Sequence, residues 1–192
     1  MPDRAPATPA TGRGSLTFRP LVRADFPLLL TWLRAPHVRA WWRGGPTTLD
    51  GVEREYGPQV DGTDPTRCFV LHLDGTPIGL FQCYRHADNP DWDRAVGVPA
   101  AAGLDYLIGE PDRCGAGIGS AAITAFTATM FGLYPEVDAI VSVPQRDNRP
   151  SCRVLEKAGF TLLEERLVDS DDPSDSGVSA IYALRRTAPP AG

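Results

Sequence analysis

Cysteine is scarce in this chain: 192 residues include four, Cys68, Cys83, Cys114 and Cys152. No two of them form a C-x-x-C pair, and no histidine cluster lies near any of them. The spacing therefore predicts neither a disulfide framework nor a metal site. Because free thiols suit a reducing compartment, we expect a cytoplasmic protein with no bound metal.

Long hydrophobic runs are also absent. No apolar stretch approaches the roughly 20 residues that a membrane-spanning helix needs, so we expect no membrane partner. Residues 1–14 lack the apolar core of a signal peptide and are expected to be a disordered tail, as are residues 187–192. The intervening residues 15–186 are enough for one domain with a sizeable core.

The chain also has fewer basic than acidic residues. The formal net charge of −5 argues against nucleic acid as a partner and permits a cationic one. Six of the twelve residues from 164 to 175 are acidic, and only Arg166 opposes them. Such a run is usually a solvated loop, and the alternative is a surface that binds a cation. The acidic residues are Glu164, Glu165, Asp169, Asp171, Asp172 and Asp175.

What the chain does have is a glycine-rich segment at 103–120, which reads GLDYLIGEPDRCGAGIGS. Residues 104–108 suit a strand, Pro111 marks a turn, and three glycines at alternate positions (Gly115, Gly117 and Gly119) open a predicted helix. Glycines leave bare backbone for a ligand, and the first N–H groups of a helix carry partial positive charge. The segment predicts a phosphate or pyrophosphate site, although a glycine-rich turn without a ligand also fits the loop alone.

The spacing excludes two common phosphate loops. The dinucleotide fingerprint G-x-G-x-x-G needs a glycine where Ser120 stands, and the chain has no Gly-Lys-Ser or Gly-Lys-Thr tripeptide of a nucleotide-triphosphate loop. A second segment, residues 148–160, begins with a good N-cap in Asn148 and contains Gly159 as a helix-ending residue. It predicts a helix followed by a strand that starts at Phe160.

The x-x-G-x-G loop and the ending EKAGF of the second segment resemble the coenzyme A loop and the closing helix of the GCN5-related N-acetyltransferases. The resemblance implies a single domain of mixed α/β (α+β) class, with a mostly antiparallel central sheet splayed at the acetyl-coenzyme A site. It also implies acetyl-coenzyme A as co-substrate. The residues that it assigns to the cofactor are Tyr106, Leu107, Ile108, Arg113, Cys114, Gly115, Ala116, Gly117, Ile118, Gly119, Ser120, Asn148 and Arg153.

The rest of the chain alternates strands and helices, which favours the same fold class. Asp25 is expected to cap a helix that Pro36 ends, and Asp74-Gly75 is expected to turn a hairpin. Residues 87–102, rich in Pro, Gly, Asp and Ala, are expected to form a long loop. The remaining predicted strands are 16–20, 68–73, 77–84 and 139–143, and the remaining predicted helices are 49–56 and 117–131.

Most of residues 15–186 is similar to one branch of that family, the aminoglycoside 6′-N-acetyltransferases. The segment HVRAWWRGG at 37–45 resembles their tryptophan-pair segment, and GLFQCY at 79–84 resembles their substrate-side strand. Siderophore-lysine acyltransferases share the tryptophan pair but carry a histidine in the strand where this chain has Asp105. Core packing for the tryptophans and backbone bonding for Asp105 are the structural alternatives. The implied substrate-binding residues are Trp41, Trp42, Gln82, Asp91, Trp92, Asp105 and Asp175.

The resemblance implies direct attack of a primary amine on the thioester, with Asp105 and the backbone at Leu107 as the catalytic groups. An ordinary aspartate has a pKa of about 3.9 and is a poor base, so we expect Asp105 to position the ammonium group. Leu155 and Val143 stand where the family often has a tyrosine and an acidic residue. The expected acceptor is a small polycationic amine, most simply an aminoglycoside at its 6′-amine, bound by a monomer or homodimer. A siderophore-lysine N-acyltransferase and a non-catalytic coenzyme A-binding regulatory module remain alternatives.

Overall fold

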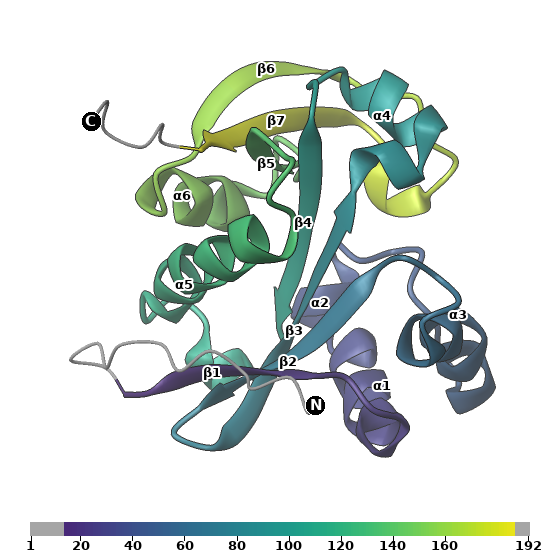
Figure 1. The fold of residues 1–192 in the computed structure, drawn as a ribbon. Coiled ribbons are helices and arrows are strands. Elements are labelled where there is room, and N and C mark those ends of the chain that lie inside the picture. Colours follow the sequence, from purple (N-terminus) through teal and green to yellow (C-terminus); the bar gives the residue numbers. More distant parts are fainter. Residues whose placement is uncertain (1–13, 187–192) are drawn as a thin grey trace.

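The computed structural model describes residues 14–186, so the predicted tails, apart from Gly14, lie outside the described residues. One seven-stranded sheet has the order β1-β2-β3-β4-β5-β7-β6 (Figure 1). Its neighbouring strands are antiparallel except for β4 and β5, which are parallel. The predicted mixed, mostly antiparallel sheet is therefore confirmed. The strands are β1 (Leu16–Pro20), β2 (Arg67–Leu73), β3 (Thr76–Arg85), β4 (Ala101–Ile108), β5 (Ala139–Ser142), β6 (Thr161–Leu167) and β7 (Val178–Arg185).

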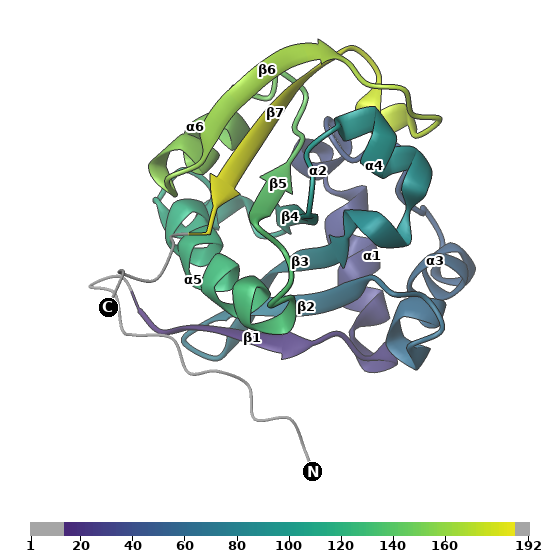
Figure 2. The same cartoon turned by 45° about the horizontal axis from the view of Figure 1, so that its top comes forward.

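Helices cover both faces of the sheet (Figures 1 and 2). Helices α5 and α6 bury their apolar sides on one face, α1 and α3 pack on the other, and α4 covers β5 and β7. No helix among the described residues is long and apolar enough to cross a membrane. The helices are α1 (Phe26–Arg34), α2 (Pro36–Arg39), α3 (Leu49–Asp61), α4 (Pro90–Val96), α5 (Ile118–Leu133) and α6 (Arg149–Lys157).

Local signals in the sequence account for several of these elements. Asp74 and Gly75 have φ of 51° and 80°, the left-handed pair that a two-residue hairpin turn between β2 and β3 requires. The Asn148 side chain accepts a hydrogen bond from the Ser151 N–H at 3.3 Å and caps α6, and Gly159 follows the helix at φ 91°. The predicted hairpin and closing helix are confirmed.

The prediction of a long loop at 87–102 was wrong. This segment contains most of a short 3-10 helix (His86–Asp88), then α4, and the first residues of β4. The Asn89 side chain accepts a hydrogen bond from the Trp92 N–H at 3.4 Å, and Pro90 occupies the first helical turn. Gly97 then ends α4 at φ 70°. These are ordinary start and stop signals, and the loop-like composition concealed them.

Three further details differ from expectation. The Asp25 carboxylate does not cap α1, because it pairs with Arg19 at 2.8 Å and accepts from the Val22 N–H at 3.0 Å. Pro36 does not simply end a helix: α1 stops at Arg34, and Pro36 starts α2. The predicted helix at 49–56 also continues to Asp61 despite an internal proline.

The feature that positions the site is the short pairing between β4 and β5. The two strands pair only where Ala101–Gly103 face Ala139–Val141. From residue 104 to residue 108, β4 is paired with β3 alone, while β5 stays paired with β7 on its other edge (Figure 2). The sheet is therefore open on one side of β4, as the resemblance implied. An extended ligand can reach the unpaired backbone edge there.

Candidate active site

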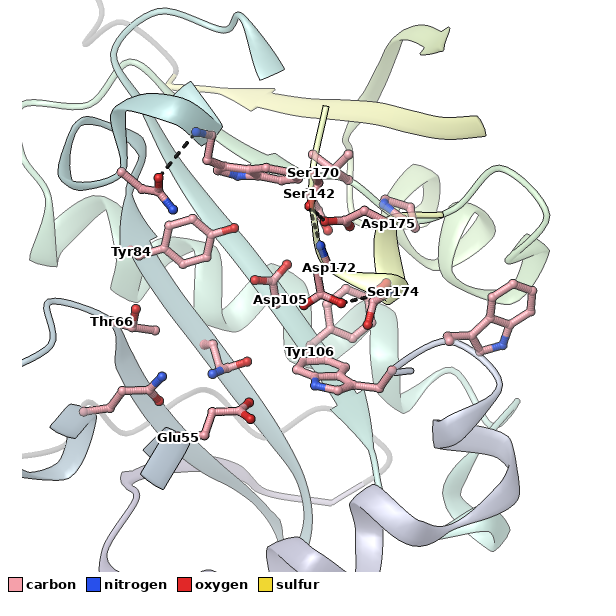
Figure 3. Close-up of a pocket in the computed structure, with 18 of the residues that line it drawn as sticks. Glu55, Thr66, Tyr84, Asp105, Tyr106, Ser142, Ser170, Asp172, Ser174 and Asp175 are labelled. Atoms are coloured by element: carbon pink, nitrogen blue, oxygen red, sulfur yellow. Dashed lines mark hydrogen bonds between the residues drawn. The ribbon is translucent and has the colours of Figure 1, made fainter. Parts of the chain in front are cut away.

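A cavity of about 550 Å³ lies where the sheet opens. It is lined by the tryptophan segment, by α3, by the ends of β3 and β4, by α4, by the segment that joins β5 to α6, and by the β6–β7 loop. Figure 3 shows Asp105 between Tyr84 and the carboxylates of that loop. Segments from the whole length of the domain thus converge on one carboxylate of β4.

The cavity is strongly acidic. Among its lining residues the one basic side chain is Arg85, which pairs with Asp88 at 2.8 Å and with Glu136 at 3.6 Å. A cationic ligand would therefore meet uncompensated negative charge. The acidic residues in the lining are Glu55, Asp64, Asp88, Asp105, Asp172 and Asp175.

Asp105 differs from an ordinary aspartate. It lies on β4 opposite Gln82 of β3, on the cavity side of the strand. Burial and the charge of Asp175 raise the pKa of Asp105 to about 7, against a hydrogen bond with Tyr84 that favours ionisation. The expectation of an ordinary pKa is corrected here: at neutral pH this carboxylate can accept a proton as well as position a cation.

The β6–β7 loop brings a second pair of carboxylates to the cavity. The Asp172 carboxylate accepts from the Ser174 N–H at 2.7 Å, and the Ser170 hydroxyl bonds Asp175 at 2.6 Å. Burial and the charge of Asp172 raise the pKa of Asp175. The acidic run is therefore more than a solvated loop, because part of it faces Asp105.

Most of the predicted substrate residues line the cavity: Trp41, Trp42, Gln82, Trp92, Asp105 and Asp175. Gln82 is 8% exposed, and its amide donates to Cys68 Sγ at 3.3 Å. Asp91 does not line the cavity. It lies on the outer side of α4, exposed and paired with Arg94, so we withdraw it from the candidate site.

Sequence analysis missed Glu55 and the importance of Tyr84. Glu55 comes from α3, and no local pattern predicted that this helix would face Asp105. Tyr84 did carry a signal, because it lies two residues after Gln82 on the same strand and hence on the same face. Its ring also lies over Gly103, where an added Cβ would be only 2.3 Å from the ring.

The predicted cofactor loop joins β4 to α5. A 3-10 turn (Pro111–Arg113) leads to Gly115 and Gly117, both at φ 77°, and Gly117 is the N-cap of α5. The backbone N–H groups of residues 118–120, in the first turn of α5, have no hydrogen-bond acceptor within the helix. The Ile118 side chain is buried in the core, so only its backbone can meet a ligand. Arg113, Cys114 and Ala116 are exposed.

The opening itself is lined from two sides. On β4, Leu107 shares a face with Asp105 but is buried under α1, whereas Tyr106 points to the other face and stacks on Phe81. The Tyr106 hydroxyl lies 2.6 Å from the Ser151 hydroxyl on α6. Both residues reach the cavity lining.

The remaining predicted cofactor residues lie around this opening. The Ile108 carbonyl accepts a hydrogen bond from the His37 ring at 3.0 Å. Asn148 lines the cavity and caps α6, whereas Arg153 is exposed on that helix. In the described part of the chain no group of three or more His, Cys, Asp or Glu side chains could hold a metal ion.

The raised pKa of Asp105 predicts a pH-dependent change in stability. The folded protein holds this proton more tightly than the unfolded chain, so stability is lost as the pH rises from about 4 through about 7. Asp105→Asn should therefore melt higher than the wild type near pH 8, by a few degrees, and equally near pH 4. Calorimetry across this range measures the difference. Asp91→Asn is the matched control, and a difference for Asp105→Asn that does not vary with pH would contradict the assignment.

Comparison with known proteins places this site in a family. A family model described as an acetyltransferase (GNAT) domain matches residues 22–167. An aminoglycoside N(6′)-acetyltransferase type 1 of Klebsiella pneumoniae is 30% identical over 176 residues, which are 90% of this chain and 87% of the relative. The lysine N-acyltransferase MbtK of a Mycobacterium species (strain MCS) is 28% identical over 88% of this chain and 67% of its own length.

Among solved structures, the aminoglycoside acetyltransferase AAC(6′)-Ib in complex with coenzyme A and kanamycin is 28% identical, with a TM-score of 0.77. The match covers 90% of this chain and 95% of that one. A second similar structure, AAC(6′)-Ib with paromomycin and acetyl-coenzyme A, has the same TM-score and covers 89% and 93%. Since the family model spans residues 22–167 and the Klebsiella pneumoniae relative is 30% identical over 87% of its length, the chain belongs to the GNAT family of acetyltransferases.

Proposed function

We propose that this protein transfers the acetyl group of acetyl-coenzyme A to a primary amine of a small polycation, and that the acceptor is the 6′-amine of an aminoglycoside antibiotic. This proposal rests on the acidic cavity around Asp105 at the open side of β4. Aminoglycosides carry several ammonium groups, and the cavity offers several carboxylates with little opposing charge. Aminoglycoside N(6′)-acetyltransferases type 1 of Klebsiella pneumoniae and Serratia marcescens are similar to this chain. The reaction would detoxify the drug in the cytoplasm.

The chain's own residues fit the phosphate end of acetyl-coenzyme A. Gly115 has open space around the position of a Cβ, and Gly117 starts α5 in a conformation that favours glycine. The backbone at 113–120 would hold the pyrophosphate at the helix N-terminus, with Asn148 and Arg153 nearby on α6. When bound, acetyl-coenzyme A supplies a thioester that an amine can attack without a protein nucleophile.

On the amine side we assign two roles to carboxylates. Asp105 takes a proton from the bound ammonium group, which its pKa of about 7 allows at neutral pH, and the neutral amine that remains attacks the thioester carbonyl. Asp172, Asp175 and Glu55 hold the ammonium groups that do not react. Trp41 and Trp92 provide flat aromatic walls against which a sugar ring or cation can lie. Holding the acceptor in this way raises its effective concentration beside the opening.

The leaving sulfur needs a donor, and the closing helix cannot supply it from Leu155, which is fully buried in the core. We assign that role to the hydroxyl pair of Tyr106 and Ser151 at the opening. Either hydroxyl can donate to the other; when Tyr106 donates, to Ser151 Oγ or to the Ser151 carbonyl at 3.5 Å, the Ser151 hydrogen can donate into the cavity. Burial raises the pKa of Tyr106, so the pair keeps its protons at neutral pH.

The lysine N-acyltransferase alternative has weaker support. That relative is less similar and is matched over a smaller share of its length. A single hydroxylated lysine side chain also presents less positive charge than the cavity's carboxylates can accommodate.

The first test is acetyl transfer itself. We expect coenzyme A release with kanamycin or tobramycin and little with N6-hydroxylysine. Asp105→Asn should lower kcat/KM by about tenfold or more, because it removes the proton acceptor and a negative charge. The wild-type value should also rise through about pH 7, and the variant should lose that step. Wild-type kcat/KM in Asp105→Asn, with Asp91→Asn as control, would show that the assigned role is wrong.

The cofactor loop can be tested with two glycines of similar backbone conformation. Gly115 at φ 77° precedes α5, and Gly62 at φ 72° ends α3 far along the chain; neither has an atom within 4 Å of an added Cβ. Gly115→Leu should weaken acetyl-coenzyme A binding about tenfold or more by calorimetry. Gly62→Leu carries a comparable backbone cost and should bind normally. Equal affinities for acetyl-coenzyme A in the two folded variants would show that this loop does not hold the pyrophosphate.

The hydroxyl pair predicts an effect on turnover alone. Tyr106→Phe keeps the ring stacked on Phe81 and removes the hydroxyl, so kcat should fall about tenfold while KM for the acceptor stays close to the wild-type value. Ser151→Ala should act in the same direction. Steady-state kinetics with kanamycin provides the measurement. Unchanged kcat in both variants would show that another group donates the proton to the leaving sulfur.

A further inference from the structure

Arg43, directly after the tryptophan pair, ties two distant parts of the chain together. Its backbone N–H donates to Ser174 Oγ at 3.0 Å, and its guanidinium donates to Ser176 Oγ at 2.7 Å and to Gln145 Oε1 at 3.1 Å. Ser174 and Ser176 belong to the β6–β7 loop, and Gln145 lies between β5 and α6. We call these four residues the clasp.

Two more contacts fasten the same place. The Gly44 N–H also donates to Ser174 Oγ, at 3.1 Å, and the Gln145 amide donates to the Ser174 carbonyl. Gly44 lies so close to Asp172 that an added Cβ would be 2.6 Å from its carboxylate oxygen. The loop is therefore held against the tryptophan segment both by hydrogen bonds and by close packing.

Ser174 lies between the two carboxylates that face the cavity from this loop. Asp172 accepts from the Ser174 N–H, and Asp175 is the next residue along the chain (Figure 3). Holding Ser174 therefore fixes where both carboxylates lie relative to Asp105. Exposed single hydrogen bonds contribute little each, but several that converge on one residue can fix a short loop.

The chemistry of the clasp is as informative as its position. The Arg43 guanidinium bonds neutral acceptors, namely Ser176, Gln145 and the Ala40 carbonyl at 3.2 Å. Among the described residues it forms no ion pair. The guanidinium thus holds the loop at Ser176, the residue after Asp175, and holds Gln145, whose amide bonds the Ser174 carbonyl, without neutralising Asp172 or Asp175. Their charge stays available for a cationic ligand.

We propose that Arg43 is a positioning residue that sets selectivity for acceptors with several ammonium groups. It fixes Asp172 and Asp175 in the same cavity as Asp105, where they hold ammonium groups of the acceptor other than the one that gives its proton to Asp105. This inference rests on the proposed transfer to a polycationic amine. A monoamine acceptor, whose one ammonium group is the group at Asp105, gains little from the clasp.

The experiment compares Arg43→Ala with Arg43→Lys, which keeps the charge but loses the forked geometry. We expect KM for tobramycin to rise about tenfold in both variants. For the monoamine 6-amino-6-deoxyglucose, kcat/KM should change less than about twofold, and kcat for tobramycin should be little changed. Arg39→Ala, at an exposed arginine of α2, is the matched control.

Amide hydrogen exchange of residues 170–178 should also become faster in Arg43→Ala, which a change confined to the chemical step would not cause. Unchanged tobramycin KM and unchanged exchange would overturn the proposal, as would full rescue by Arg43→Lys or a fall in kcat alone. If the wild type acetylates no amine, the proposed function fails. Calorimetry of tobramycin binding to the wild type and to Arg43→Ala then tests the role of the clasp separately. Equal affinities, or no binding to either protein, would overturn that role.

Discussion

The structure of the site depends on the fact that β4 keeps its partner β5 for only three residues. Beyond Gly103 one edge of β4 is unpaired, and everything that carries chemistry lies along that edge or beside it. Asp105 is the second residue past the separation, Tyr106 reaches across to α6, and the glycine loop follows the strand end. A fully paired sheet of the same strands would leave no room at this position for an extended thioester next to an amine. The opening is thus the constraint from which the rest of the arrangement follows.

Electrostatics then gives the opening its selectivity. Carboxylates from α3, β4 and the β6–β7 loop share one cavity, and the nearest arginines are engaged elsewhere, Arg85 with acidic neighbours and Arg43 with neutral groups. Burial and neighbouring carboxylates raise the pKa values of Asp105 and Asp175, which means that the ionised carboxylates destabilise the folded protein. A bound polycation relieves this cost. The protein thus gives up some stability for affinity towards multiply charged amines, a common trade at functional sites.

The sequence allowed the parts with local signals to be predicted. Glycines before α5, the Asn148 cap and the hairpin turn each need only neighbouring residues, and all three are present. The open sheet came from family resemblance. Side-chain environments could not be predicted, because they depend on residues far apart in the chain. Burial and the charge of Asp175 raise the pKa of Asp105. Asp91 pairs with Arg94 on the outside of α4 and does not line the cavity. Arg43 carried no local signal for its role, because Ser176 and Gln145, which its side chain bonds, lie more than a hundred residues away.

The most direct test of this account is the titration of Asp105 itself, followed by carboxyl-carbon NMR with Asp105→Asn for assignment. In the protein without acceptor, we expect Asp105 to have a pKa of about 7. Saturation with kanamycin should lower that pKa by one unit or more, because an ammonium group then lies beside the carboxylate. An ordinary aspartate pKa in the free protein, or a pKa that kanamycin leaves unchanged, would contradict the account.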